Sequence, residues 1–171
     1  IEAVNQMLAY DKTIKILIEP KPNEPIDRSF CGTLGHVMGL SAATADPSRV
    51  GGLLESAHAI LAGLDPANEI AFGLAMGKLW GVHLNDQNGM KYDQDKAFGV
   101  ENLRQAFNQV KVLVENGYGQ NGEYVGLDVK AMRTQPDEVS YRHLENSLAI
   151  VKALEEKVAR FDYAFQKQCQ E

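Results

Sequence analysis

The sequence lacks several features that would place a protein in a specialised class. Among its 171 residues there are two cysteines, Cys31 and Cys169, which lie far apart and form no Cys-x-x-Cys pair. A disulfide-rich secreted scaffold or a structural zinc site needs more cysteines at closer spacing. We therefore interpret both thiols as reduced and expect a cytoplasmic protein.

Long apolar runs and basic clusters are also missing. No stretch approaches the ~20 consecutive apolar residues that a membrane-spanning helix needs, and no secretory signal is visible. The formal net charge is −6, and the lysines and arginines are dispersed along the chain. A nucleic-acid groove needs a basic surface that displaces counterions. We therefore expect neither a membrane nor a nucleic acid as partner.

An initiator methionine is absent as well, because the chain begins with Ile1. We expect that the chain is processed or is a piece of something longer. Its composition, 44% hydrophobic and 23% charged, is that of a globular protein. Its length corresponds to one ordinary domain, which can bury a substantial core.

What the sequence does contain is an alternation of strand and helix patterns. Apolar runs suited to buried strands lie at 14–18, 50–54, 81–85 and 124–129. Helical patterns lie at 1–10, 31–43, 67–79, 100–116 and 138–167. This alternation predicts an α/β fold of four βα units, with parallel strands and right-handed helical crossovers. A closed (β/α)8 barrel needs eight such units, so the pattern predicts either half of a barrel or a small open sheet.

Charged and imidazole side chains follow each of the four predicted strands. They are Glu19 and Lys21 after the first, Glu55 and His58 after the second, His83, Asp93 and Asp95 at and after the third, and Asp128 in the fourth. The carboxyl ends of parallel strands meet at one edge, where α/β proteins build their sites. An unpaired buried carboxylate is very costly. We therefore expect one convergent cluster that binds a hard divalent cation.

Each of these pieces has an ordinary interpretation when it is taken alone. A Glu-x-x-His or Asp-x-Asp sequence is common on solvated surfaces, and Lys21 could form a salt bridge with Glu19. The other two histidines, His36 and His143, lie inside helical stretches, and we interpret them as structural or exposed. The combination is more specific than any single piece.

Together the pieces resemble the D-xylose isomerase family over essentially the whole chain. Residues 18–25, Ile-Glu-Pro-Lys-Pro-Asn-Glu-Pro, resemble the segment after the fifth barrel strand of that family. Leu84-Asn85 with residues 89–95, Gly-Met-Lys-Tyr-Asp-Gln-Asp, resemble the long loop after the seventh strand. Asp128-Val129-Lys130 with Arg133-Thr134 resemble the segment after the eighth. The resemblance implies that residues 1–171 are a single partial domain, the carboxyl-terminal half of a TIM barrel with βα units five to eight, and that the amino-terminal half is absent from this chain.

The resemblance also implies a two-metal site. The cations would be Mg²⁺ or Mn²⁺, with Co²⁺ as a further candidate. The implied ligands of the first cation are Glu19, Glu55, His83 and Asp128, and those of the second are Glu55, His58, Asp93 and Asp95. The implied catalytic residues are Lys21, His58 and Asp93, with Lys21 bound to the sugar carbonyl oxygen. The implied reaction interconverts an aldose and a ketose by a metal-assisted hydride shift on a small-molecule sugar.

Two departures from the family pattern bear on the substrate. Position 83 is a histidine, where D-xylose isomerases carry aspartate and L-rhamnose isomerases carry histidine. Glu55 departs the other way, because rhamnose isomerases tend to have aspartate there. The first four strands of the family supply a His–Asp pair for ring opening and the aromatic wall around the sugar, and this chain has neither. We therefore expect a fragment that is inactive alone and that pairs, through its open sheet edges, in a homo-oligomer or with a complementary amino-terminal half-barrel.

Other functions remain open at this point. A ketose epimerase on the same barrel would use one cation and a pair of glutamates, and the second ligand set and Asp128 disfavour it. A nuclease acting at apurinic sites on a similar barrel is disfavoured by the acidic charge. A non-catalytic half-barrel that needs a partner is the third alternative.

Overall fold

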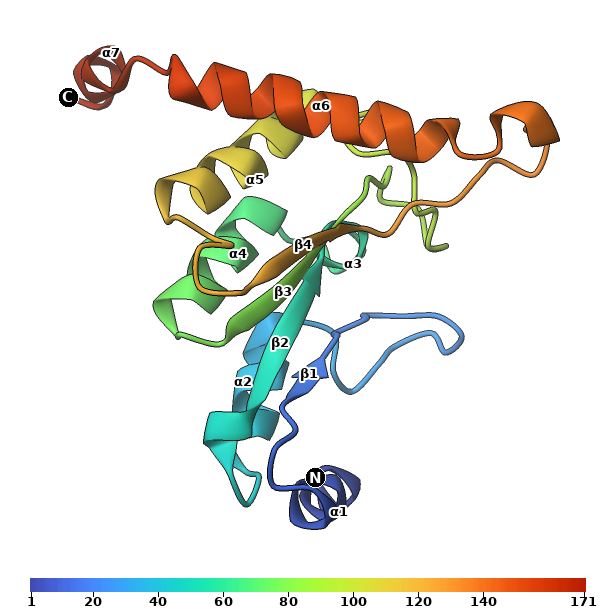
Figure 1. Ribbon diagram of the computed structural model, residues 1–171, viewed down its shortest axis with the longest axis vertical. Helices are drawn as coiled ribbons and strands as arrows, with labels where there is room; N and C mark the ends of the chain where they lie inside the picture. Colours follow the sequence, from blue (N-terminus) through green and yellow to red (C-terminus); the bar gives the residue numbers. More distant parts are fainter.

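The computed structural model describes residues 1–171 and shows one parallel sheet with helices packed against it (Figure 1). The strands are β1 (Ile16–Ile18), β2 (Val50–Glu55), β3 (Leu79–Leu84) and β4 (Tyr124–Leu127). They lie side by side in chain order, and every neighbouring pair is parallel. Successive crossovers of the same hand produce this order. The predicted α/β class with four βα units is confirmed.

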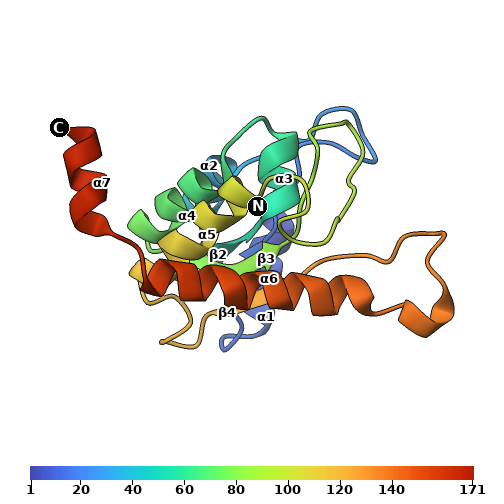
Figure 2. The same ribbon diagram turned by 90° about the horizontal axis from the view of Figure 1, so that it is seen from above.

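Five of the helices match the helical patterns of the sequence. They are α1 (Glu2–Tyr10), α2 (Leu34–Ala42), α4 (Pro66–Ala75), α5 (Leu103–Glu115) and α6 (Arg142–Ala159). Three of these helices begin at a polar cap residue. The side chains of Thr33, Asp65 and Asn102 accept hydrogen bonds from backbone N–H groups in the first turns of α2, α4 and α5, respectively. In Figure 2, α2, α4 and α5 lie together on one face of the sheet.

Several boundaries differ from the expectation. The sequence pattern predicts a loop between residue 55 and Asp65, but β2 runs directly into a further helix, α3 (Ser56–Leu61). The helix expected at 67–79 ends at Ala75. Gly77 adopts a φ of 64°, which a glycine tolerates and which turns the chain into β3. The last strand is also shorter than expected, because β4 ends at Leu127.

The long helix expected at 138–167 is interrupted. A 3₁₀ turn, η2 (Asp137–Val139), precedes α6, and a separate helix, α7 (Tyr163–Gln170), follows it. Asp162 accepts a hydrogen bond from the backbone N–H of Phe165 and so caps α7 as a new helix. A charged surface pattern alone does not distinguish two capped helices from one. A second 3₁₀ turn, η1 (Pro47–Arg49), leads into β2.

The hydrophobic core lies between the sheet and the helices. Thirteen buried apolar residues form it, among them Leu54, Val82 and Leu84 from the strands and Leu34, Ile70, Val110 and Leu154 from the helices. Alternate residues of the strands therefore point toward the helices, and the residues between them point to the other face. This alternation places Leu54 in the core and Glu55 at the site described below.

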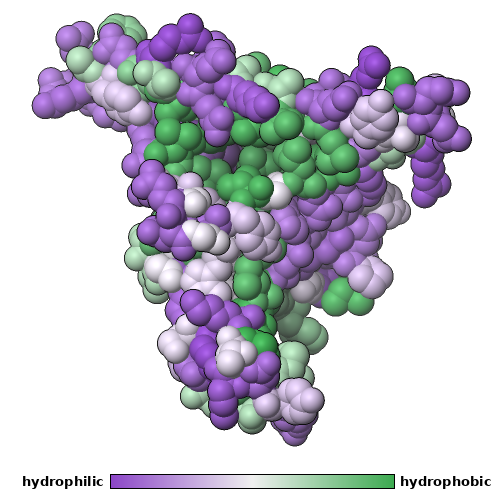
Figure 3. Space-filling model, in the orientation of Figure 1, coloured by the Kyte–Doolittle hydropathy of each residue, from purple (hydrophilic) through white to green (hydrophobic).

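The two outer strands, β1 and β4, form the edges of the sheet. Next to β4, apolar side chains gather between the strand and α6 (Figure 3). Three apolar residues of these two elements remain exposed, namely Val125 (45%), Leu144 (40%) and Leu148 (47%); we call them the β4–α6 patch. None of the helices combines the length and apolar character needed to cross a bilayer.

Candidate metal centre

The site forms where the four strands end. Glu55 is the last residue of β2 and is paired in register with His83 near the end of β3. His83 is in turn paired with Gly126 of β4. Glu19 and Asp128 directly follow β1 and β4. Because all strands are parallel, this register brings four side chains that are far apart in the sequence to one edge of the sheet.

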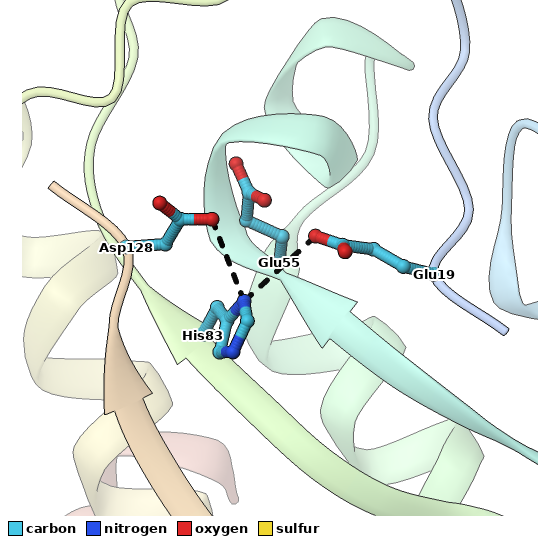
Figure 4. A group of neighbouring side chains, drawn as sticks. All are labelled: Glu19, Glu55, His83 and Asp128. Atoms are coloured by element: carbon cyan, nitrogen blue, oxygen red, sulfur yellow. Dashed lines mark ion pairs between the residues drawn. The ribbon is translucent and has the colours of Figure 1, made fainter. Parts of the chain in front are cut away.

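Four of the residues expected to bind a cation form one group (Figure 4). Glu19, Glu55, His83 and Asp128 each offer one ligand atom, and these atoms lie within 4.8 Å of one another. The imidazole Nδ1 of His83 lies 3.5 Å from an oxygen of Asp128 and 3.8 Å from an oxygen of Glu19. Three carboxylates and one imidazole nitrogen therefore surround a single point.

A second group shares Glu55 with the first. Its members are Glu55, His58 and Asp93. His58 lies on α3, one helical turn after Glu55, with its Nε2 3.3 Å from Glu55 and 3.0 Å from Asp93. The helix that the sequence analysis missed is thus what orients His58. The loop after β3 delivers Asp93 to the same place.

Asp95 lies outside both groups. Its carboxylate oxygen is 2.9 Å from the ammonium of Lys130, which also donates to the backbone carbonyl of Asp93. The backbone φ of Asp95 is 43°, which is in the left-handed region that few non-glycine residues adopt. The expected ligand set is therefore brought together except for Asp95, which binds Lys130 instead.

The electrostatics of the two groups centre on Glu55. Its side chain is 2% exposed. Burial, followed by the neighbouring carboxyl of Glu19, raises the pKa of Glu55 to about 10, although a hydrogen bond from Asn85 opposes this shift. A buried carboxyl with such a raised pKa is a site where a cation would be strongly favoured.

Asp93 is shifted in the opposite direction. Burial alone would raise its pKa, but hydrogen bonds from His58 and Lys21 hold the pKa of Asp93 well below its usual range. The ammonium of Lys21 lies 2.7 Å from an Asp93 oxygen and 3.4 Å from Glu24. Although burial alone would lower it, contact with Asp93 raises the pKa of Lys21. Lys21 thus remains a charged donor beside the cluster.

Asn85 and Asp86 support the site although the sequence analysis assigned neither a role. Asn85 donates to Glu55 at 2.7 Å and to the carbonyl of Asp128 at 3.0 Å, and it accepts from the N–H of Ala57 at 2.7 Å. Asp86, which is 3% exposed, accepts from the backbone N–H groups of Gln87, Glu101 and Asn102 and closes the loop after β3. Both residues directly follow β3, which is the same signal that identified the ligands.

Gly126 leaves room for the ring of His83. A Cβ atom at this position would lie 3.1 Å from Cδ2 and 3.5 Å from Nε2 of His83. We expect Gly126→Ala to displace the ring and to weaken Mn²⁺ binding by about tenfold, as changes around metal ligands commonly do. Isothermal titration calorimetry with Mn²⁺ measures this effect. Gly39→Ala in α2, where nothing lies within 4 Å, is the control, and equal affinities in the two variants would contradict the prediction.

Comparison with curated proteins shows which sequences this chain is similar to. The chain is 34% identical over 164 residues to the xylose isomerase of Thermus thermophilus and 33% identical over 164 residues to that of Thermus caldophilus. Each match takes in 94% of this chain and 42% of the relative. It is also 39% identical over 122 residues to the xylose isomerase of Streptomyces lividans. The chain therefore spans less than half the length of the curated relatives it matches. No protein-family model matches it.

Solved structures share the fold. A D-tagatose 3-epimerase-like protein superposes with a TM-score of 0.64 at 22% identity, and 3-keto-D-glucoside 4-epimerase from E. coli with a TM-score of 0.59 at 17% identity. The superpositions cover 89% of this chain in both cases and 52% and 50% of those chains. The four βα units thus correspond to about half of a TIM barrel.

Proposed function

The chain belongs to the xylose isomerase-like TIM-barrel family, and we propose that it is the carboxyl-terminal half-barrel of a divalent-metal-dependent sugar isomerase that interconverts an aldose and a ketose. The observation that carries this proposal is the pair of ligand groups that share Glu55. The similarity to three xylose isomerases over most of this chain supports the same chemistry. In this proposal residues 1–171 are βα units five to eight.

The donor atoms fit a pair of hard divalent cations. Carboxylate oxygens supplemented by imidazole nitrogens suit Mg²⁺ and Mn²⁺, and Co²⁺ accepts the same ligands. Two buried ligand atoms, Nδ1 of His83 and Oδ1 of Asp93, have no hydrogen-bond partner. Buried polar atoms are rarely left unpaired without a function. These free atoms, together with the buried carboxyl of Glu55, are what a bound cation would satisfy.

The ligand assignment follows from the two groups. Glu19, Glu55, His83 and Asp128 would hold the first cation, and Glu55, His58 and Asp93 the second. We include Asp95 in the second set because it lies two residues from Asp93, and its contact with Lys130 would then have to break or be shared. When bound, two such cations would polarise the adjacent sugar oxygens between which hydrogen moves.

Lys21 has the position and charge for a catalytic role. Its ammonium lies beside Asp93 and is one-third exposed, so it can also reach a ligand above the cluster. A fixed donor aimed at an oxygen that gains negative charge stabilises the transition state more than the ground state. We propose that Lys21 binds the carbonyl oxygen of the sugar, and that His58 and Asp93 hold the second cation beside it.

An epimerase on the same fold is the second candidate. Two solved epimerases share the half-barrel, and the buried Glu55 could act on a proton at the carbon next to a carbonyl. The separate His58–Asp93 group favours the isomerase, because a second cation is suited to polarising two sugar oxygens rather than one. The products distinguish the two candidates, since only an isomerase converts an aldose to a ketose.

We also propose that a complementary amino-terminal half-barrel, or another copy of the chain, completes the site. The relatives are more than twice as long as the matched region. Here β1 and β4 leave unpaired edges, and the β4–α6 patch remains exposed beside one of them. Closing the sheet into a barrel removes exposed edges.

A panel of aldoses and ketoses tests the proposed function. The longer protein that carries this chain should interconvert at least one aldose–ketose pair when Mn²⁺ or Mg²⁺ is present, and EDTA should abolish the reaction because the ligand groups are then empty. Deuterium at the transferred position should stay with the product if hydrogen moves by a hydride shift. Conversion of ketose to ketose only would establish the epimerase, and activity that persists in EDTA would contradict both candidates.

A further inference from the structure

We propose that this chain carries a second site, which binds an anionic group such as phosphate or carboxylate. The site is a cavity of about 640 Å³ between the loop after β3, the segment after β4 and the start of α6. The polar residues that line it are Gln94, Lys96, Lys130, Arg133, Thr134 and His143. We call it the basic cavity. It is distinct from the metal centre, none of whose ligands line it.

The charge of this cavity is opposite to that of the protein. The chain has a net charge of −6, yet three cations and no carboxylate line the basic cavity. Four other cavities of the chain each include at least one aspartate or glutamate. A concave surface with a single sign of charge concentrates counter-ions of the other sign. In this chain such a surface favours an anion.

The cations of the basic cavity keep donors for a ligand. Arg133 forms no ion pair, so its whole guanidinium fork is free to bind two oxygens of one anion. Lys130 contacts Asp95 and the Asp93 carbonyl, and Lys96 contacts Glu101. An ammonium has three N–H donors, so each lysine retains at least one. Arg133 is therefore the principal anchor, and the lysines contribute charge.

Further polar groups line the cavity. Nδ1 of His143 is buried and has no hydrogen-bond partner, and Thr134 adds a hydroxyl. His143 is the second residue of α6, whose cap residue Tyr141 provides no side-chain hydrogen bond. The amino-terminal end of a helix carries partial positive charge, which adds to the attraction for an anion. In barrel enzymes, loops after the last two strands and a helix start often form a phosphate site.

The basic cavity adjoins the metal centre. Gln94, which lines the cavity, lies in the sequence between Asp93 and Asp95. Lys130 also lines the cavity, and its ammonium donates a hydrogen bond to Asp95. The anion can therefore be a phosphate or carboxylate carried by the substrate itself, or a free phosphate that binds beside it. The first assignment rests on the proposed function, whereas the second does not. The recognition chemistry is the same in both cases.

Binding of inorganic phosphate to the longer protein tests the site, measured by isothermal titration calorimetry without added metal and against a chloride background. We expect Arg133→Gln to weaken phosphate binding by about tenfold or more, the cost of losing one charged hydrogen-bonding partner. Arg104 is an exposed arginine at the start of α5, so Arg104→Gln should leave the affinity for phosphate unchanged.

Thermal melts identify any misfolded variant. Lys96→Gln then provides a second test, with a smaller expected loss of phosphate affinity. No phosphate binding, equal binding in the two arginine variants, or full displacement by equimolar chloride would overturn the site.

Comparison of ligands identifies the source of the anion. A ketose phosphate that binds more tightly than inorganic phosphate assigns the cavity to the substrate, and equal affinities assign it to a free anion. Both outcomes support the site. Turnover of sugars and Mn²⁺ binding are measured separately, so a failed isomerase assay with intact phosphate binding contradicts only the proposed function. Loss of phosphate binding with active isomerase contradicts only the basic cavity.

Discussion

Replacing Glu55 with glutamine is expected to abolish tight binding of Mn²⁺ while making the metal-free protein more stable. Glu55 is the residue that both ligand groups share, so its loss should remove both binding events rather than one. Calorimetric titration of the protein should show two equivalents of Mn²⁺ in the wild type and none of comparable affinity in Glu55→Gln. The increase in melting temperature that Mn²⁺ causes should disappear with them.

The gain in stability follows from the pKa of Glu55. Because its pKa in the folded protein lies at about 10, above the ordinary value of 4.5, the metal-free folded state holds one more proton than the unfolded state between these values. Stability that depends on this proton is fully present below the ordinary value and is lost as pH rises through the window. Glutamine is neutral at every pH, so the advantage of Glu55→Gln should grow from pH 5 to pH 9.

Glu138→Gln is the matched control for this prediction. Glu138 lies exposed in η2 and is not part of either ligand group, so the same chemical change there should alter neither Mn²⁺ binding nor the pH dependence of stability. Thermal melts of the metal-free variants over the pH range provide the measurement. Two retained equivalents in Glu55→Gln would contradict the assignment of Glu55 as the shared ligand.

Replacing Lys21 with methionine is expected to produce the largest loss of turnover that leaves the metal ligands intact. Removal of a single donor that stabilises developing negative charge typically costs about 10²- to 10³-fold in kcat. Methionine keeps most of the unbranched side chain but removes the ammonium that lies 2.7 Å from Asp93. We expect kcat to fall by this factor with a much smaller change in KM, because the contact is stronger in the transition state.

Two further variants separate catalysis from folding. Lys21→Arg keeps the charge but changes the geometry of the donors, so it should recover part of the lost rate. Lys152→Met, at an exposed position on α6, should have wild-type kinetics. Mn²⁺ binding to Lys21→Met should remain measurable, because Lys21 is not a ligand. A Lys21→Met enzyme with kcat within about threefold of the wild type would remove Lys21 from the mechanism.

The fold was largely predictable because its signals are local. Short apolar runs and capped helical patterns alternate along the chain, and alternation of this kind has few compact solutions other than a parallel sheet. The errors lie where a local pattern is ambiguous. Residues 56–61 read as a loop after a strand, although they form a helix whose first turn is anchored from a distant part of the chain, where the N–H of Ala57 donates a hydrogen bond to the side-chain oxygen of Asn85.

The sequence predicted which residues come together at the site. The polar residues at the ends of the predicted strands include Glu19, Glu55, His83 and Asp128, and their position alone indicates a site, because burying an unpaired charge is costly. The supporting residues Asn85 and Asp86 and the basic cavity were not identified. Their roles depend on segments 10 or more residues apart in the chain, as in the hydrogen bond between Asn85 and Glu55 and the cavity that Lys96 and Arg133 line together.

The sequence by itself determined the order of strands and helices, the family resemblance and the residues at the strand ends, because each of these is a property of neighbouring residues or of a motif. Only the tertiary structure decided how those residues are grouped. Strand register placed Glu55 beside His83, the short helix α3 turned His58 toward Asp93, and Asp95 contacts Lys130 outside both ligand groups. Distances of a few ångströms between segments far apart in the chain depend on packing, and no local pattern encodes them.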